Sequence, residues 1–233
     1  MIILFAPAKT FKEGNISSNT NLRFNETNKL IDIVKTWDKD TYINNFMISD
    51  SVYNEVKSYY DNFYVNPSYE AFTMFIGQSY IGLDYESLDV ESKKYIQDKV
   101  YVIDALYGII KPNDAIKMYR LDFTVKNLNL KKIWKEQIND YFDNIQDKEI
   151  LSLSSTEFSS ILSKDKTVYN ISFVNIVNGK KKKISVFNKQ MRGKLLRYLS
   201  QNKINCVDEL PLIFEGYKLY KEGYELIYEE ICE

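Results

Sequence analysis

The sequence contains no histidine, and this absence excludes several kinds of chemistry at once. Without an imidazole there can be no Ser-His-Asp or Cys-His catalytic machinery and no histidine-ligated metal. Any catalysis would have to use lysine, tyrosine, carboxylate or hydroxyl side chains. A Mg²⁺ ion held by carboxylates remains compatible with these residue types, but we expect neither a metal nor another cofactor.

Cysteine and long apolar runs are scarce as well. Cys206 and Cys232 are the two cysteines, in no metal-ligand spacing, and are expected to be ordinary reduced thiols. No apolar run reaches the roughly 18–20 residues of a membrane-spanning helix. Residues 1–5 are too few for the core of a signal peptide, and no basic residue precedes them. These features predict a cytoplasmic protein with no membrane partner, and we expect a monomer.

The composition is that of a well-packed protein. The chain has 233 residues, of which 45% are hydrophobic and 15% aromatic. A chain of this length buries roughly 70% or more of its unfolded surface. No internal repeat or low-complexity linker interrupts it, so we expect a single domain over residues 1–233. Strand-like and helical segments alternate irregularly, which predicts an α/β (mixed α+β) fold with a central mixed sheet, surrounding helices and a late β-hairpin.

Hydrophobic periodicity and end signals place the expected elements. Helical spacing covers residues 26–36, 39–47, 50–63, 86–99, 131–144 and 188–202. Short apolar runs predict buried strands at residues 2–5, 71–76, 100–106 and 149–153. Asn178-Gly179 is a strong turn signal between hairpin strands expected at 168–177 and 182–187. Two closing strands are expected at 217–220 and 224–228.

The charges are segregated although the formal net charge is only −1. Residues 166–207 contain no Asp or Glu and hold ten basic side chains, at positions 166, 180, 181, 182, 183, 189, 192, 194, 197 and 203. Residues 208–233 carry eight acidic residues against two lysines. A block of one sign raises the local concentration of counter-ions, and phosphate is the usual partner of a basic block. Taken alone, lysines 180–183 are better explained as a solvated hairpin tip, since they follow an Asn-Gly turn signal, whereas the whole acid-free stretch favours a function.

Polar residues follow four of the expected strands, where open α/β sheets keep their binding sites. Lys9 follows the first strand, and the glycine-containing segment 77–83 follows the second. The third is followed by Tyr107, Lys111, Asp114, Tyr119 and Arg120, and the fourth by Ser154, Ser155 and Glu157. We expect these residues to converge on one site, although a glycine after a strand is often only a turn. No Walker loop or dinucleotide fingerprint is present.

Several short segments form a recognisable combination in chain order. Their sequences are APAKT at 6–10, FIGQSYIGL at 75–83, LYGIIKPND at 106–114, YRLD at 119–122, SLSSTEF at 152–158, KQMRG at 189–193 and EGY at 215–217. Together they resemble the motifs of the bacterial YaaA peroxide-stress family. The chain departs from the family pattern at Ala6, Lys111, Ser152 and Met191, which stand in place of Ser, Arg, Asn and a small residue.

The resemblance implies a protein of hydrogen-peroxide stress and iron homeostasis, which limits damage by unincorporated iron. It also implies DNA binding through a positively charged cleft on a mixed α/β fold particular to the family. A helix-hairpin-helix element is attributed to the family, and Leu106-Tyr107-Gly108-Ile109 offers its apolar-glycine-apolar pattern with one glycine instead of two.

Two functions remain open. In the first, the chain binds DNA without catalysis, in a structure-selective or nonspecific manner, because no recognition-helix pattern for base readout is present. The expected phosphate or base contacts are Lys9, Tyr80, Tyr107, Lys111, Arg120, Lys189 and Arg192, with the two tyrosines either stacking on unpaired bases or lying in the core. In the second, an enzyme acts on a small phosphorylated or nucleotide-like anion, with Glu157, Asp114 or Lys9 as catalytic candidates. A groove as wide as a duplex favours the first function, and a closed pocket of roughly 300–1,000 Å³ favours the second.

Overall fold

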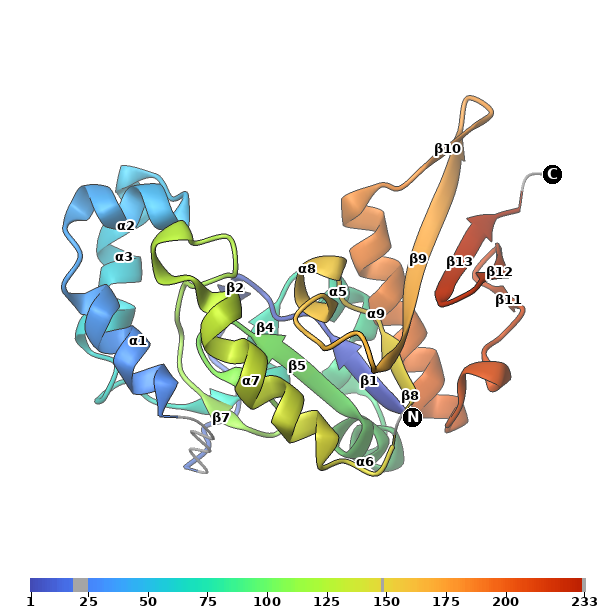
Figure 1. The fold of residues 1–233 in the computed structure, drawn as a ribbon, viewed down its shortest axis with the longest axis horizontal. Coiled ribbons are helices and arrows are strands. Elements are labelled where there is room, and N and C mark those ends of the chain that lie inside the picture. The colour runs from blue at the N-terminus through green and yellow to red at the C-terminus, as the bar shows by residue number, and fades with distance from the viewer. Residues whose placement is uncertain (19–24, 148, 232–233) are drawn as a thin grey trace.

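The computed structural model describes residues 1–18, 25–147 and 149–231. Within them, a nine-stranded mixed sheet has the order β11-β12-β13-β9-β8-β1-β5-β6, and β10 pairs with β9 beside this path (Figure 1). Its strands are β1 (Ile2–Phe5), β5 (Val100–Asp104), β6 (Gly108–Ile110), β8 (Glu149–Ser152), β9 (Thr167–Val177), β10 (Lys180–Lys182), β11 (Ile213–Phe214), β12 (Tyr217–Glu222) and β13 (Glu225–Glu230). Two small antiparallel pairs join β2 (Thr10–Phe11) to β4 (Phe75–Ile76) and β3 (Tyr69–Glu70) to β7 (Ala115–Ile116).

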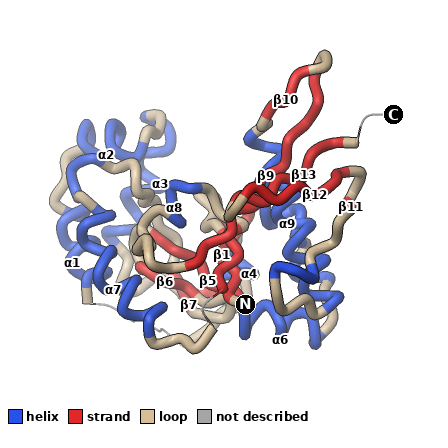
Figure 2. Tube along the Cα trace, turned by 45° about the vertical axis from the view of Figure 1, so that its right-hand side comes forward, coloured by secondary structure: helices blue, strands red, loops and turns tan. Residues whose placement is uncertain are grey.

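Helices surround the sheet. They are α1 (Glu26–Lys35), α2 (Lys39–Phe46), α3 (Asp50–Asp61), α4 (Ala71–Met74), α5 (Gln78–Leu83), α6 (Val90–Lys99), α7 (Leu130–Asp143), α8 (Thr156–Ser159) and α9 (Ser185–Asn202), with 3₁₀ turns at Tyr85–Ser87, Lys126–Leu128 and Val207–Glu209. Figure 2 shows α1–α3 gathered at one end of the molecule, and β9, β10, β12 and β13 at the other. The α/β class expected from the sequence is confirmed. None of the helices in the described residues is long and apolar enough to cross a membrane.

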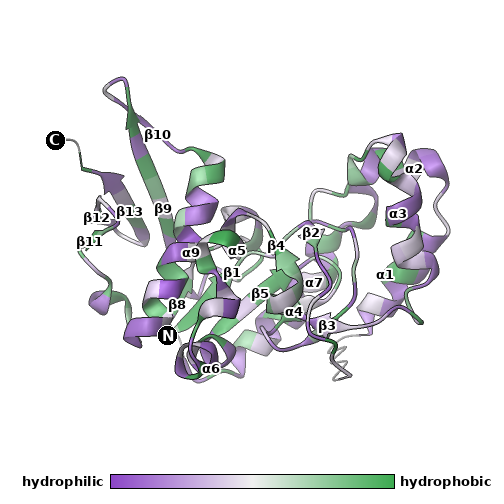
Figure 3. Cartoon of the chain, turned by 180° about the vertical axis from the view of Figure 1, so that it is seen from behind, coloured by the Kyte–Doolittle hydropathy of each residue, from purple (hydrophilic) through white to green (hydrophobic). Residues whose placement is uncertain are grey.

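The centre of the sheet is parallel and buried. The adjacent strands β13, β9, β8, β1 and β5 run parallel to one another. Every residue of β1 is at most 2% exposed, as expected for an unbroken apolar run covered on both faces. Helix α7 packs against β5, where Tyr101 contacts the rings of Tyr141 and Phe142. Figure 3 shows hydrophobic residues concentrated in these central strands and hydrophilic residues along the outer helices.

The hairpin expected at Asn178-Gly179 is confirmed, but its second strand is shorter than predicted. Both turn residues have positive φ angles, 51° and 71°, as a two-residue type I′ turn requires. Strand β10 ends at Lys182, and α9 begins at Ser185 within the predicted strand. The side chain of Asn188 explains this, because it bonds both the amide (2.8 Å) and the carbonyl (2.5 Å) of Phe173. The register of β9 and β10 shows that a longer β10 would need those same backbone groups.

Two other expectations are corrected. Residues 71–76 form α4 and the two-residue β4 rather than one buried strand. The amides of Ala71 and Phe72 bond the carbonyls of Asp114 and Pro112, so a distant loop sets the conformation of this apolar run. Leu106–Ile109 is not a helical hairpin. It comprises the last two residues of the turn between β5 and β6 and the first two residues of β6, with Gly108 at a φ of 72°.

Candidate nucleic-acid interface

Three of the predicted site segments meet at the carboxyl edge of the parallel strands. Strand β1 lies between β5 and β8, which are the next two strands along the chain that run parallel to it in this sheet. The chain therefore crosses from one side of β1 to the other, which creates the switch point where open sheets bind ligands. Lys9 leaves β1, Asp104 ends β5, and Ser154 and Glu157 follow β8 at this edge.

Lys9 is held by an acidic partner. Its Nζ lies 2.5 Å from Oδ2 of Asp122, whose Oδ1 accepts the amide of Thr124 at 2.8 Å. Burial raises the pKa of Asp122, but the hydrogen bonds from Lys9 and Thr124 outweigh it and lower that pKa below its usual range. Arg120 lies beside this pair and donates from Nη1 to the carbonyl of Lys9 at 3.2 Å. The charge of Lys9 is thus neutralised by Asp122, and Arg120 stabilises the loop that contains Lys9.

The cavity beside Lys9 is small. It has a volume of about 30 Å³ and is lined by Pro7, Ala8, Lys9, Ala105, Tyr119, Leu121, Asp122 and Phe158. Ordinary small-molecule pockets begin at roughly 300 Å³. This cavity therefore has no room for a nucleotide-sized substrate.

Tyr80 and Tyr107 are core residues with bonded hydroxyl groups. Their exposed fractions are 7% and 4%. The hydroxyl of Tyr80 donates to the carbonyl of Ala6 at 3.0 Å, and that of Tyr107 accepts the amide of Lys117 at 3.0 Å. Burial raises the pKa of both phenols. Of the two fates considered for these tyrosines, the structure gives the core, since neither ring has a face free for a base.

Arg192 caps a strand. Strand β8 pairs with β9 only as far as Ser152 and Asn170. The amide of Asn170 points toward β13, so the carbonyl of the next residue, Ile171, faces the side that β8 has vacated. Nε and Nη2 of Arg192 donate to this carbonyl at 3.1 and 2.7 Å. Burial lowers the pKa of Arg192 to about 10, against the opposing effect of Glu225. The guanidinium remains charged at neutral pH. It takes the place of the β8 residue that would otherwise pair with Ile171, so it is not available to a phosphate.

Lys111 and Asp114 lie away from this edge. The Lys111 ammonium donates to the carbonyl of Asp98 at 3.1 Å and lies 3.7 Å from the ring centre of Tyr101, near the amino end of β5. The buried carboxylate of Asp114 accepts the amide of Lys111 at 2.6 Å and closes the turn between them. Both residues therefore stabilise a loop at the opposite edge of the sheet.

The other two predicted residues are more accessible. Glu157 is half-buried in the first turn of the short helix α8, and no ion pair of its carboxylate occurs within the described ranges. Lys189 is exposed near the start of α9. Lys189 is thus an exposed predicted phosphate contact whose ammonium forms no ion pair with an acid in the described ranges.

A run of four lysines lies on the hairpin of residues 175–183, called here the basic hairpin, which projects from the body in Figure 1. Several cations of the acid-free block are engaged elsewhere: Lys166 with Asp143, Lys194 with Glu215, and Arg197 with the end of α5. In contrast, Lys180, Lys182 and Lys183 are exposed, and none of them forms an ion pair with a described acid.

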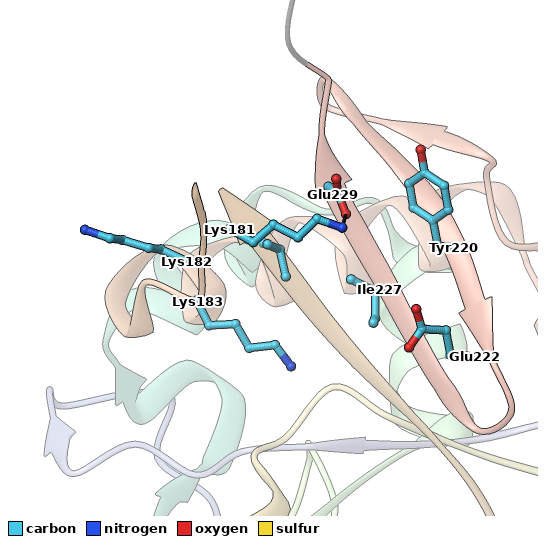
Figure 4. Close-up of a pocket in the computed structure, with 8 residues that line it drawn as sticks. Lys181, Lys182, Lys183, Tyr220, Glu222, Ile227 and Glu229 are labelled. Atoms are coloured by element: carbon cyan, nitrogen blue, oxygen red, sulfur yellow. Dashed lines mark ion pairs between the residues drawn. The ribbon is translucent and has the colours of Figure 1, made fainter. Parts of the chain in front are cut away.

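A groove runs beside the basic hairpin (Figure 4). It has a volume of about 460 Å³ and lies between the hairpin and strands β12 and β13. Lys181 reaches across it and pairs with Glu229 at 2.6 Å, while Tyr220 and Glu222 stand on the far wall. We call it the hairpin groove. Sequence reasoning missed Tyr220. Lys218, Tyr220 and Glu222 occupy every second position of β12, and this spacing places Tyr220 on the solvent face of the strand.

Comparisons with known proteins agree with the motifs. A family model described as "Peroxide stress protein YaaA" matches residues 1–223. A UPF0246 protein of Fusobacterium nucleatum is 32% identical over 239 residues, covering 95% of this chain and 94% of the relative. UPF0246 proteins of Finegoldia magna and Rickettsia bellii are also 32% identical, covering 90% and 94% of this chain and 88% and 94% of their own. The chain therefore belongs to the YaaA peroxide-stress family.

Proposed function

We propose that this protein serves the peroxide-stress response by binding the phosphate backbone of nucleic acid. The bound protein covers the DNA and thereby limits iron-dependent damage to the DNA. The principal contact is the basic hairpin. The observation that carries the proposal is the exposure of Lys180, Lys182 and Lys183 without an acidic partner in the described part of the chain.

Helix α9 supports the same contact. Its amino-terminal residues, from Ser185, follow directly on the basic hairpin, and Lys189 is exposed one turn further along. The free amide groups and the positive end of the helix dipole favour an anion at this place. Lysines that act as point charges give phosphate attraction without sequence readout, so we expect binding to be nonspecific in sequence.

An enzyme acting on a nucleotide-like anion at Lys9 is less well supported. The cavity there is only about 30 Å³, and Lys9 and Arg120 are already bonded to Asp122 and to the backbone. Glu157→Gln separates the alternatives. A binding protein should retain peroxide protection in proportion to its DNA affinity, whereas normal DNA binding with lost protection would favour catalysis.

The experiment is a salt titration of binding to a fluorescein-labelled duplex, read by anisotropy. The double variant Lys182→Gln/Lys183→Gln should weaken binding and flatten the slope of log K against log salt by about 1.8, because each phosphate contact contributes about 0.9. The matched control is Lys132→Gln/Lys135→Gln, which removes the same charge from exposed positions on α7. Equal slopes for both variants would refute the hairpin as the principal contact.

A further inference from the structure

We infer that the hairpin groove binds an unpaired nucleotide, with its phosphate on the lysine wall and its base against Tyr220. This inference rests on the proposed function, because it names the form of nucleic acid that the basic hairpin selects. The groove volume of about 460 Å³ lies within the range of small-molecule sites, so it can admit a single nucleotide rather than a duplex.

The floor and far wall of the groove offer a surface suited to a base. Tyr220 is 45% exposed, and the apolar side chains of Val174 and Ile227 lie beside it. The register explains this grouping, because Tyr220 lies opposite Ile227 across β12 and β13, on the face that carries Glu229 and Val174. Aromatic side chains of this kind stack on any base, since every base has a π-face.

The two walls of the groove have opposite charges. Lys181 and Lys183 stand on the hairpin side, whereas the side chain of Lys182 points away from the groove, and Glu222 and Glu229 stand opposite. One phosphate strand is attracted to the lysine wall, but a second strand would meet the carboxylates. Like charges a few ångströms apart repel, and a duplex carries phosphate on both sides. The charge pattern therefore favours a single strand in the groove.

The carboxylate wall also has a constructive role toward a base. A carboxylate is a hydrogen-bond acceptor and pairs with exocyclic amino groups such as that of cytosine. Glu229 already forms an ion pair with Lys181. Glu222 is therefore the carboxylate of this wall that is more available to accept a hydrogen bond from a base. A base with an exocyclic amino group can thus stack on Tyr220 and donate a hydrogen bond to the carboxylate wall. The lysine wall then contacts the phosphate of the same nucleotide.

The test compares two strands of equal charge by fluorescence anisotropy at fixed salt. One is a labelled twelve-nucleotide oligo(dC), and the other is a labelled strand of twelve abasic tetrahydrofuran phosphates. Wild type should bind oligo(dC) about 5- to 100-fold more tightly, the range expected for base–aromatic stacking. Tyr220→Ala should abolish this preference and leave abasic-strand and duplex binding unchanged. Tyr220→Phe should retain it, since the ring persists.

The matched control is Tyr224→Ala. Tyr224 is 59% exposed in the turn between β12 and β13, where its ring contacts Tyr169 instead of lining the groove. This variant should keep the full preference for oligo(dC). Equal binding of both strands by wild type, or a preference that survives Tyr220→Ala, overturns the inference while phosphate binding stands. Absence of binding to both strands and to duplex overturns the proposed function together with the inference.

Discussion

Gly82 of α5 and Gly193 of α9 lie at the crossing of the two helices, where neither position has room for a side chain. A Cβ at Gly82 would lie 2.1 Å from the carbonyl oxygen of Gln190, and one at Gly193 would lie 1.9 Å from that of Ser79. This contact fixes α5, whose Tyr80 bonds Ala6, to α9, whose Arg192 bonds Ile171. It therefore joins the loop of Lys9 to the helix behind the basic hairpin.

Gly193→Ala tests this close contact by the sign of its effect. At an open helix position, replacing glycine by alanine stabilises by about 1 kcal/mol. Here the new methyl group must displace backbone, so the free energy of unfolding should fall by about 1–3 kcal/mol or more. Urea unfolding measures the change, with Gln201→Ala on the exposed face of the same helix as the control. A stabilised Gly193→Ala variant would contradict the geometry.

Asp122→Asn tests the ion pair with Lys9 through its pH dependence. The pKa of Asp122 is below its ordinary value of 3.8 in the folded protein, so the unfolded state binds more protons near that pH and stability rises with pH. The variant should lose about 1–3 kcal/mol at pH 7, as for hydrogen bonds to charged groups. The loss should shrink as the pH falls below about 4, where the unfolded-state carboxyl becomes protonated. A loss that is constant from pH 7 to pH 3, measured by urea unfolding, would mean that the charge has no role.

Glu229→Gln should strengthen nucleic-acid binding. Glu229 neutralises Lys181 across the hairpin groove, and its removal frees that ammonium for phosphate. Affinity should rise, and the slope of log K against log salt should steepen by about 0.9. Asp61→Asn removes an equal charge from the Lys57 pair on α3 and serves as the control. An unchanged slope for Glu229→Gln would show that Lys181 does not contact phosphate.

Arg192→Gln should affect stability instead of binding. Its guanidinium satisfies the carbonyl of Ile171, so its loss should cost about 1–3 kcal/mol in the free energy of unfolding. The salt dependence of duplex binding should keep its wild-type slope, provided that titrations are run well below the unfolding temperature. A slope flattened by about 0.9 would place Arg192 on phosphate after all.

Some features could be predicted because neighbouring residues alone decide them. The unbroken apolar run of residues 2–5 indicated a buried strand, and Asn178-Gly179 indicated a hairpin whose turn residues tolerate positive φ. The acid-free block from Lys166 to Val207 could also be identified from the sequence, since charge depends only on residue type. The family motifs could be read in order for the same reason.

Which of these residues is available to a ligand was decided by the tertiary structure. Arg192 looked like a phosphate contact, but β8 ends one residue too early to pair with Ile171, and no local pattern announces where a distant strand stops. Tyr80 and Tyr107 are buried while Tyr220 is exposed, although the three side chains are chemically identical. The chemistry of a side chain depends only on the residue type at that position. Its burial and its hydrogen-bond partners depend on segments far away in the chain.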